Sequence, residues 1–141
     1  MERRAFVRLV GGGVVLAAGA GTGLAGCSAE PPAAAVQAWA DAGRPSEVRR
    51  WVLSHAILAP HSHNLQSWLV DLSTPDEILL RCDLTRLLQE TDPFSRQIMM
   101  SQGTFIELAA IAARERGLRA EITLFPHGEF GPTTLDERPV A

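Results

Sequence analysis

The segment from residue 59 to residue 68, Ala-Pro-His-Ser-His-Asn-Leu-Gln-Ser-Trp, carries the densest group of chemically capable side chains in the sequence. It places the Ser62 hydroxyl, two imidazoles and the amides of Asn64 and Gln66 in one stretch. These groups supply both hydrogen-bond donors and acceptors. An isoalloxazine edge, with its alternating carbonyl and N–H groups, is one flat heterocycle that such amides match. The alternative is that both amides satisfy backbone groups within a turn, and the chemistry alone favours that second interpretation.

Two other kinds of site are conceivable for the same loop. His61 and His63 form an H-x-H pair, which would need a third metal ligand from His55, His127 or Cys82. No C-x-x-C or H-E-x-x-H pattern accompanies the pair, so we do not expect a metal site. The sequence also lacks the G-x-S-x-G motif of a serine hydrolase. Cys82 itself lies in an apolar run and is predicted to be a buried thiol.

Arg96 is a second candidate for ligand binding. It follows the pair Asp92-Pro93, which is typical of a helix start with Asp as N-cap and Pro at the first helical position. Anions are stabilised at helix N-termini, so Arg96 could contact a phosphate there. The alternative is a surface arginine paired with Glu90 or Asp92.

The elements that must position these residues follow from apolar spacing and breakers. Val48 to about Ala59 has helical spacing, with Ser46 as a candidate N-cap and Pro60 as the stop. The rest is predicted as three strands and one long helix. The strands are residues 66–72, 77–83 and 119–125, and the helix is residues 92–116, ending before Gly117. Because this helix is apolar nearly all round, we expect it to be buried on most sides.

The N-terminus has the pattern of an export signal. Arg3 and Arg4 begin an R-R-x-F-x-R motif that resembles the twin-arginine signal, and residues 9–26 form an uncharged, Gly- and Ala-rich run. The run ends in L-A-G-C, which resembles a bacterial lipobox and predicts lipidation of Cys27. We therefore expect residues 1–27 to be a signal peptide with lipobox. Residues 28–45 are predicted to be a tether leading into a short helix near Trp39.

The formal net charge of −3 argues against a nucleic-acid partner, because phosphate-binding domains carry a basic excess. The apolar fraction of 46% is too high for a disordered chain. Length and composition thus fit one small globular domain behind the signal.

The loop and the helix start together resemble a known family. A-P-H-S-H-N-L-Q-S-W is similar to the nitroreductase signature A-P-S-x-x-N-x-Q-P-W. Downstream, Asp83 begins D-x-x-R-x-L, Asp92 begins D-P-x-x-R, and Ser101 begins S-x-G before an apolar helix that ends in Gly. These blocks resemble the Acg-type branch of the family, and the resemblance covers residues 48–125.

This resemblance implies an α+β flavoprotein fold, a long buried helix packed on a small sheet, that binds FMN non-covalently. Residues 46–141 would form the N-terminal part of a nitroreductase-like domain. A second nitroreductase half or a homodimer partner would complete the flavin site. The residues that would face the flavin are Pro60, His61, Ser62, Asn64 and Gln66, with Arg96 on the anionic or pyrimidine side of FMN.

The sequence departs from the family pattern at several points. The usual Ser after Pro is His61, and the usual Pro before Trp is Ser67. The usual Arg-x-Ser phosphate clamp near the domain start has no match, since residues 32–35 read Pro-Ala-Ala-Ala there. The family domain is also longer than this sequence, which therefore looks like an N-terminal piece.

The resulting prediction is an exported, FMN-binding oxidoreductase of the nitroreductase type, located in the periplasm and anchored to the membrane through Cys27. It would transfer a hydride through FMN from a small-molecule electron donor to a small-molecule acceptor. Two alternatives stay open: a flavin-sequestering protein without turnover, and a cofactor-free lipoprotein that uses the domain for protein contacts.

Overall fold

The computed structural model describes residues 30–141. The predicted twin-arginine signal and the lipidation site Cys27 lie outside the described residues. The chain divides into two units between Ala35 and Val36, and the hydrophobic core lies within residues 36–141. In the described part, no helix is long and apolar enough to cross a membrane.

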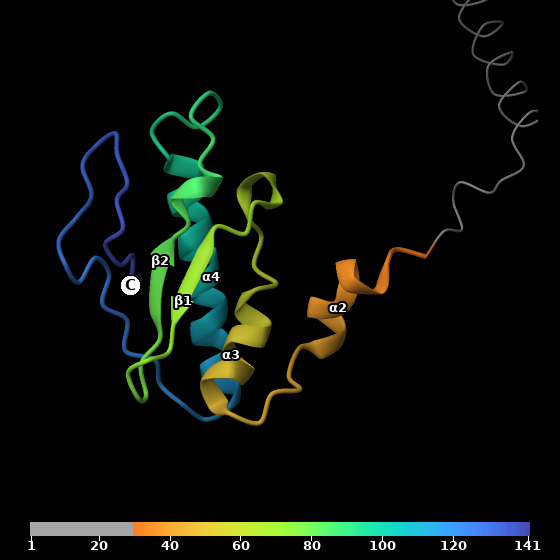
Figure 1. The fold of residues 1–141 in the computed structure, drawn as a ribbon. Helices are drawn as coiled ribbons and strands as arrows, with labels where there is room; N and C mark the ends of the chain where they lie inside the picture. The colour runs from red at the N-terminus through yellow and green to blue at the C-terminus, as the bar shows by residue number, and fades with distance from the viewer. Residues whose placement is uncertain (1–29) are drawn as a thin grey trace, which may run out of the picture. The chain divides into compact units, whose positions relative to one another are not determined.

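The described chain forms three α-helices and one antiparallel hairpin (Figure 1). Two short 3₁₀ helices lie in the connections. The elements are α2 (Ala33–Asp41), α3 (Val48–Ala56), η1 (Ser62–Asn64), β1 (Trp68–Asp71), β2 (Leu79–Cys82), η2 (Leu84–Arg86) and α4 (Arg96–Glu115). This confirms the predicted α+β class and the first two strands.

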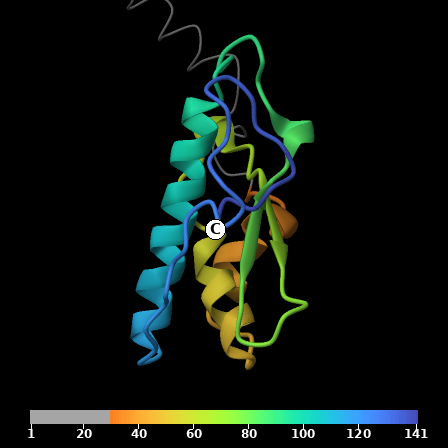
Figure 2. The same cartoon turned by 90° about the vertical axis from the view of Figure 1, so that its left-hand side faces the viewer.

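The hairpin packs on one side of the helix pair α3 and α4 (Figure 2). Its register places Trp68 opposite Cys82 and Val70 opposite Leu80. The centre of the core is Leu80, Ala56 and Phe105, one from the sheet and one from each helix, all with almost no exposure. Burying a large apolar side chain contributes about 1.5–3 kcal/mol, so this contact fixes the sheet against the helices.

The start of α3 differs from the prediction. The N-cap is Glu47 and not Ser46, because the Glu47 carboxylate accepts hydrogen bonds from the amides of Arg49 and Arg50. One guanidinium nitrogen of Arg49 also donates to three carbonyls of the β1–β2 connection, at 2.8–3.1 Å. α3 ends at Ala56, before the Pro60 predicted to stop it.

The long helix begins later than predicted. Its first residue is Arg96, and Ser95 in the N-cap position has a left-handed backbone with φ of 50°. The buried Asp92 carboxylate still caps the helix, because it accepts hydrogen bonds from the amides of residues 96, 97 and 98 at 2.9–3.1 Å. At the other end, Gly117 has a φ of 71°. The Gly117 amide donates to the Arg114 carbonyl and the Leu118 amide donates to the Ala113 carbonyl, which together form a Schellman motif.

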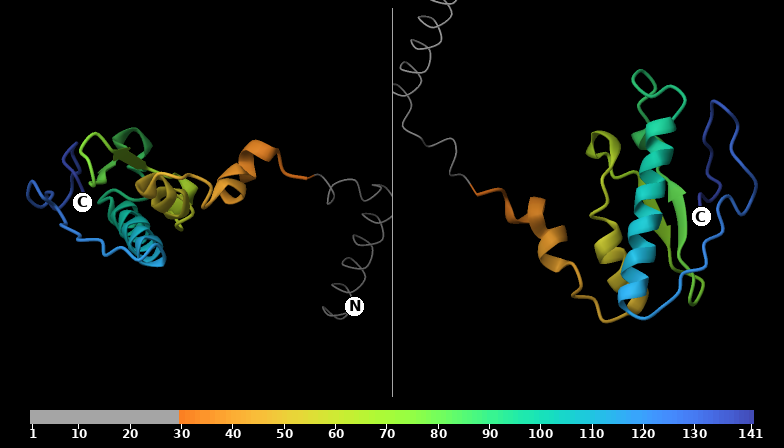
Figure 3. Two further views of the ribbon diagram at one scale, coloured as in Figure 1. Left: turned by 90° about the horizontal axis from the view of Figure 1, so that it is seen from below. Right: turned by 180° about the vertical axis from the view of Figure 1, so that it is seen from behind.

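The prediction that α4 is buried on most sides is wrong. Its buried residues line one side, toward α3 and the hairpin. Met100 is 73% exposed and Ile111 41% exposed on the opposite side. Viewed from behind, α4 stands in front of the other described elements of its unit (Figure 3, right). Within residues 36–141, the elements that pack against α4 all lie on one side of the helix, so the side that carries Met100 and Ile111 is exposed to solvent.

The predicted third strand at residues 119–125 is also wrong, because this segment has no regular structure. The residues beside β2 are instead Val140 and Ala141. Both of their amides donate to the Leu80 carbonyl, and the Leu80 amide donates to the Ala141 carbonyl, which is the hydrogen-bond pattern of a β-bulge. Val140 is 2% exposed and packs against Cys82 and Ile98.

Candidate functional site

The predicted loop connects α3 to β1 and lies against the first half of α4. Thr104 donates to the Pro60 carbonyl at 2.7 Å, and the Ser62 amide donates to the Ser101 hydroxyl at 3.0 Å. The Ser62 hydroxyl bonds the Gln97 side-chain oxygen at 3.0 Å. These three contacts bring the two sequence blocks of the predicted site together in space.

A buried polar centre lies beneath the loop. Ser67 and Gln102 are both 0% exposed. The Gln102 amide nitrogen donates to the Ser67 carbonyl at 3.0 Å and to its hydroxyl at 3.2 Å. The Cys82 sulfur lies 3.9 Å from the same hydroxyl. Burial raises the pKa of the Cys82 thiol, so it stays protonated and unreactive, as the sequence predicted for a buried thiol.

The His61 ring points into this centre. The Ser67 amide donates to His61 Nε2 at 3.2 Å, and the Ser67 hydroxyl lies 2.9 Å from the same nitrogen. A nitrogen that accepts from an amide carries no proton, so the proton is on Nδ1, which lies 2.8 Å from the Ser62 carbonyl and donates to it. The ring also meets the edge of Trp68, with centroids 5.0 Å apart. Both ring nitrogens are thus engaged within the protein.

The middle of the loop has an unusual backbone. His63, Asn64 and Gln66 all have positive φ, of 52°, 52° and 51°. Side-chain-bearing residues in this region cost about 1 kcal/mol or more each, and they persist only where the surrounding structure holds them. All three side chains are exposed, and none has a hydrogen bond within the described residues. Strain at exposed polar residues is typical of a binding loop.

The structure therefore divides the predicted loop residues into two groups. His61 and Ser62 have their polar atoms bonded within the protein, and the exposed Pro60 offers a carbonyl that Thr104 already holds. Asn64 and Gln66 present their amides to solvent. The alternative in which these two amides satisfy backbone groups of a turn is not what the structure shows.

Arg96 lies next to Gln97, at the edge of the same surface. Its guanidinium is over the Phe94 ring, 5.1 Å from the centroid, and the part of the chain that the structure describes gives it no ion pair with Glu90 or Asp92. The helix amides around it are occupied by Asp92. An anion near Arg96 would thus meet the guanidinium but not the free N–H groups of a helix N-terminus.

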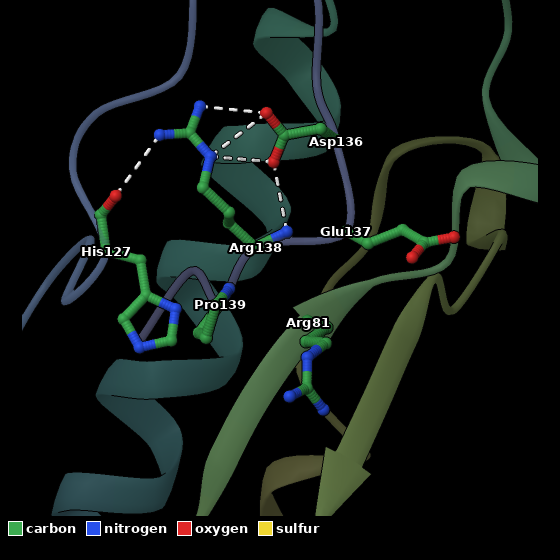
Figure 4. Close-up of a pocket in the computed structure, with 6 residues that line it drawn as sticks. All are labelled: Arg81, His127, Asp136, Glu137, Arg138 and Pro139. Atoms are coloured by element: carbon green, nitrogen blue, oxygen red, sulfur yellow. Dashed lines mark hydrogen bonds and ion pairs between the residues drawn. The ribbon is translucent and has the colours of Figure 1, made fainter.

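The structure also has a concave area that the sequence did not predict. It is an open depression of about 540 Å³ beside β2 (Figure 4), lined by Arg81, His127, Asp136, Glu137, Arg138 and Pro139. Arg138 and Asp136 are bonded to each other at 2.8–3.0 Å, and this contact lowers the pKa of the Asp136 carboxyl. Arg138 also donates to the carbonyls of His127 and Gly128. Because the Asp136 and Arg138 charges are engaged with each other, we assign no ligand to this depression. The D-x-R spacing of these two residues is the sequence feature that could have indicated their ion pair.

The described residues hold no metal centre. Among residues 30–141, no three His, Cys, Asp or Glu side chains converge as metal ligands do. His61 has no free nitrogen, and His63 points to solvent from the loop. The H-x-H pair is thus split between an inward and an outward side chain.

The chain resembles two proteins of Mycobacterium tuberculosis. They are "Putative NAD(P)H nitroreductase MT3217" of strain CDC 1551 / Oshkosh and "Putative NAD(P)H nitroreductase Rv3131" of strain ATCC 25618 / H37Rv. Each is 33% identical over 82 residues, which is 57% of this chain and 23% of the relative. The chain thus spans about a quarter of the length of the curated relatives it matches. No family model and no solved structure matches the chain. The similarity supports the nitroreductase resemblance seen in the loop and helix motifs.

Chemically, the arrangement is a polar loop that is hydrogen-bonded to α4 and presents two outward amides, with Arg96 at the first residue of that helix. Amides supply both a donor and an acceptor in one plane, which suits the edge of a flat heterocycle. The Cys82, Ser67 and His61 side-chain atoms are engaged beneath the loop, so none of these three is presented to a ligand as a nucleophile or general base.

Proposed function

We propose that this chain is the N-terminal part of an exported FMN-dependent oxidoreductase of the nitroreductase type. The observation that carries the proposal is the outward presentation of Asn64 and Gln66 on a loop whose backbone is held in a left-handed conformation. The similarity to NAD(P)H nitroreductases supports the same conclusion. When bound, FMN would supply the hydride chemistry, and the protein would supply binding and orientation.

The described residues offer more hydrogen-bonding groups for the isoalloxazine ring of FMN than for its phosphate. Asn64 and Gln66 would hydrogen-bond the pyrimidine edge of the isoalloxazine with their free amides. Arg96 would contribute a positive charge on the anionic side of the cofactor. The His61 ring nitrogens are bonded beneath the loop, and the Ser62 hydroxyl donates to Gln97 at an exposed contact, so we propose neither as a principal ligand of the ring. The first amides of α3 and α4 are already bonded to Glu47 and Asp92, so we propose that a further segment or a partner domain holds the phosphate.

The electron donor is proposed from the relatives, whose names state NAD(P)H. The test uses the full chain, meaning this segment together with the remainder of the protein that is proposed to complete the flavin site. It is titrated with FMN by fluorescence, and the complex is then reduced with NADH or NADPH under anaerobic conditions. Addition of a nitroaromatic or a quinone should restore the oxidised flavin spectrum. A chain that never retains flavin would contradict the proposal and favour the cofactor-free lipoprotein. Bound flavin that is not reoxidised by any acceptor would favour a sequestering protein.

We further propose that the protein belongs to the Acg-type branch, reaches the periplasm by the twin-arginine pathway and is held at the membrane by lipid on Cys27. The R-R-x-F-x-R and L-A-G-C motifs support this part of the proposal. The twin-arginine route carries folded proteins, so FMN could be loaded before export.

A further inference from the structure

The two positions at which the loop departs from the nitroreductase signature contact each other. His61 replaces the usual Ser, and Ser67 replaces the usual Pro. His61 Nε2 lies 2.9 Å from the Ser67 hydroxyl and accepts the Ser67 amide at 3.2 Å. They are six residues apart in sequence, at the two ends of the loop.

Each residue meets a need that the other creates. Ser67 is 0% exposed, so its amide hydrogen would lose solvent without gaining a partner if His61 were absent. A buried N–H group left without an acceptor is strongly unfavourable. Proline at position 67 has no amide hydrogen, so a chain with Pro there would not need the imidazole. A serine side chain at position 61 would be too short to replace the ring nitrogen.

The contact is also anchored from the helix and from within the loop. Gln102 of α4 donates to both the carbonyl and the hydroxyl of Ser67. On the other side, His61 Nδ1 donates to the Ser62 carbonyl. The ring therefore ties the first residues of the loop to its last residue, and Gln102 ties that residue to α4. The strained residues 63, 64 and 66 lie between the two ends.

We propose that His61 and Ser67 form a coupled lock, and that both are positioning residues that hold the loop in the conformation presenting Asn64 and Gln66. His61 acts through the loop and not by contact with the cofactor. The lock itself follows from the hydrogen bonds alone, whereas its effect on FMN binding rests on the proposed function.

The test is a double-mutant cycle in the full chain with His61→Ser, Ser67→Pro and the pair together. Each single variant should lower the melting temperature by about 5 °C or more, since each breaks a buried contact. The pair should lose clearly less than the sum, because it removes the buried amide and its acceptor together. Additive losses would overturn the lock.

Further variants keep the test decisive if Ser67→Pro does not fold. His61→Gln carries a side-chain oxygen that can accept the Ser67 amide, so it should recover most of the melting temperature lost in His61→Ser. The matched control for stability is His63→Asn. It replaces an exposed imidazole of the same loop with a residue that tolerates a left-handed backbone, and it should leave the melting temperature unchanged. In addition, ¹⁵N shifts of the His61 ring in the unaltered chain should report the Nδ1–H tautomer. A ring that exchanges freely between tautomers would contradict the lock.

Flavin binding then tests the positioning role. FMN affinity should fall about tenfold in His61→Ser and return toward the original value in the pair, a change of about 1.4 kcal/mol. Equal FMN affinity in all variants, together with a coupled loss of stability, would overturn positioning and leave a purely structural lock. If the unaltered full chain, with the proposed remainder of the flavin site present, binds no FMN, the proposed function fails, while the stability cycle still decides the lock.

Discussion

At the scale of single residues, the structure assigns different roles to side chains that look alike in the sequence. His61 and His63 are two positions apart, yet one ring is bonded beneath the loop and the other is exposed. Ser62 and Ser67 differ in the same way, since only Ser67 is fully buried. Within the loop, the side chains that remain as candidate flavin ligands are those of Asn64 and Gln66.

The first prediction concerns Asn64. In the full chain, Asn64→Ala should remove one or two hydrogen bonds to the flavin, worth about 1–3 kcal/mol in a dry site, or roughly a 5- to 150-fold loss of FMN affinity. Fluorescence titration measures this loss. Because alanine also strains a left-handed backbone, Asn64→Gly is the cleaner comparison, as it removes the amide and keeps the conformation. Unchanged affinity in both variants would refute the assignment.

The second prediction concerns Arg96. Arg96→Gln should weaken FMN binding and reduce its salt dependence, because it removes a charge that faces the anionic part of the cofactor. The free energy of unfolding should change by no more than about 0.5 kcal/mol, since the side chain is exposed. Arg114→Gln, on the same exposed side near the far end of α4, is the control and should leave flavin binding unaltered. If both variants bind FMN with the same affinity and the same salt dependence, Arg96 is a surface residue that does not contact the cofactor.

At the scale of elements, α4 decides the geometry of the site. Four side chains in the first half of this helix form hydrogen bonds with the loop, at Pro60, Ser62 and Ser67. They belong to Gln97, Ser101, Gln102 and Thr104. The start of α4 therefore sets where the loop can be fastened. That start depends on Asp92, whose carboxylate takes three amides.

The third prediction tests this dependence. Asp92→Ala should cost about 1–2 kcal/mol of unfolding free energy, because it leaves the first amides of α4 without a cap. It should also weaken FMN binding, since Gln97 and Ser101 hold the loop from that end. Asp92→Asn keeps an oxygen acceptor and should cost less. Denaturant unfolding measures both variants, and equal stability of Asp92→Ala and the unaltered chain would show that the cap is dispensable.

At the scale of the whole molecule, two features point beyond residues 30–141. The outer side of α4 carries the exposed Met100 and Ile111. The relatives it resembles are about four times longer than the matched segment. We propose that a second nitroreductase half or a second copy of the chain covers this side and completes the flavin site.

The fourth prediction follows from the exposed side of α4. The mature chain, residues 28–141, should self-associate, because exposed apolar side chains on the outer side of α4 favour association. It should bind FMN poorly by itself, because the proposed flavin site needs a second half or a partner. Met100→Glu should shift the association to higher concentration, as measured by sedimentation velocity. Glu107→Gln, on the same side but without added charge, is the comparison. A monodisperse monomer with stoichiometric, tightly bound FMN would prove this expectation wrong.

The fifth prediction concerns export of the whole precursor. Replacing Arg3 and Arg4 with Lys should retain the protein in the cytoplasm, because a receptor reads the arginine pair and not its charge. Cys27→Ala should leave export intact but release the protein from the membrane fraction. Cell fractionation and immunoblotting distinguish the two. Membrane retention of the Cys27→Ala protein would contradict lipid anchoring.

The sequence by itself determined the local elements and the position of the loop. Apolar spacing located α3, β1, β2 and most of α4, because these patterns reflect which side chains must leave water. Gly117 marked the end of α4 because its positive φ is a local requirement. The motif around Asn64 and Gln66 identified the loop without any knowledge of its contacts.

Only the tertiary structure decided the rest. Val140 beside Leu80 is a pairing between distant residues, and nothing local distinguishes a C-terminal Val that finds a strand from one that does not. Whether α4 is covered on one side or two depends on how many elements pack around it. The inward turn of His61 depends on Ser67 and Gln102, which lie 6 and 41 residues further along the chain. Sequence patterns report which groups can bond, whereas burial decides which of them must, and burial is a property of the assembled fold.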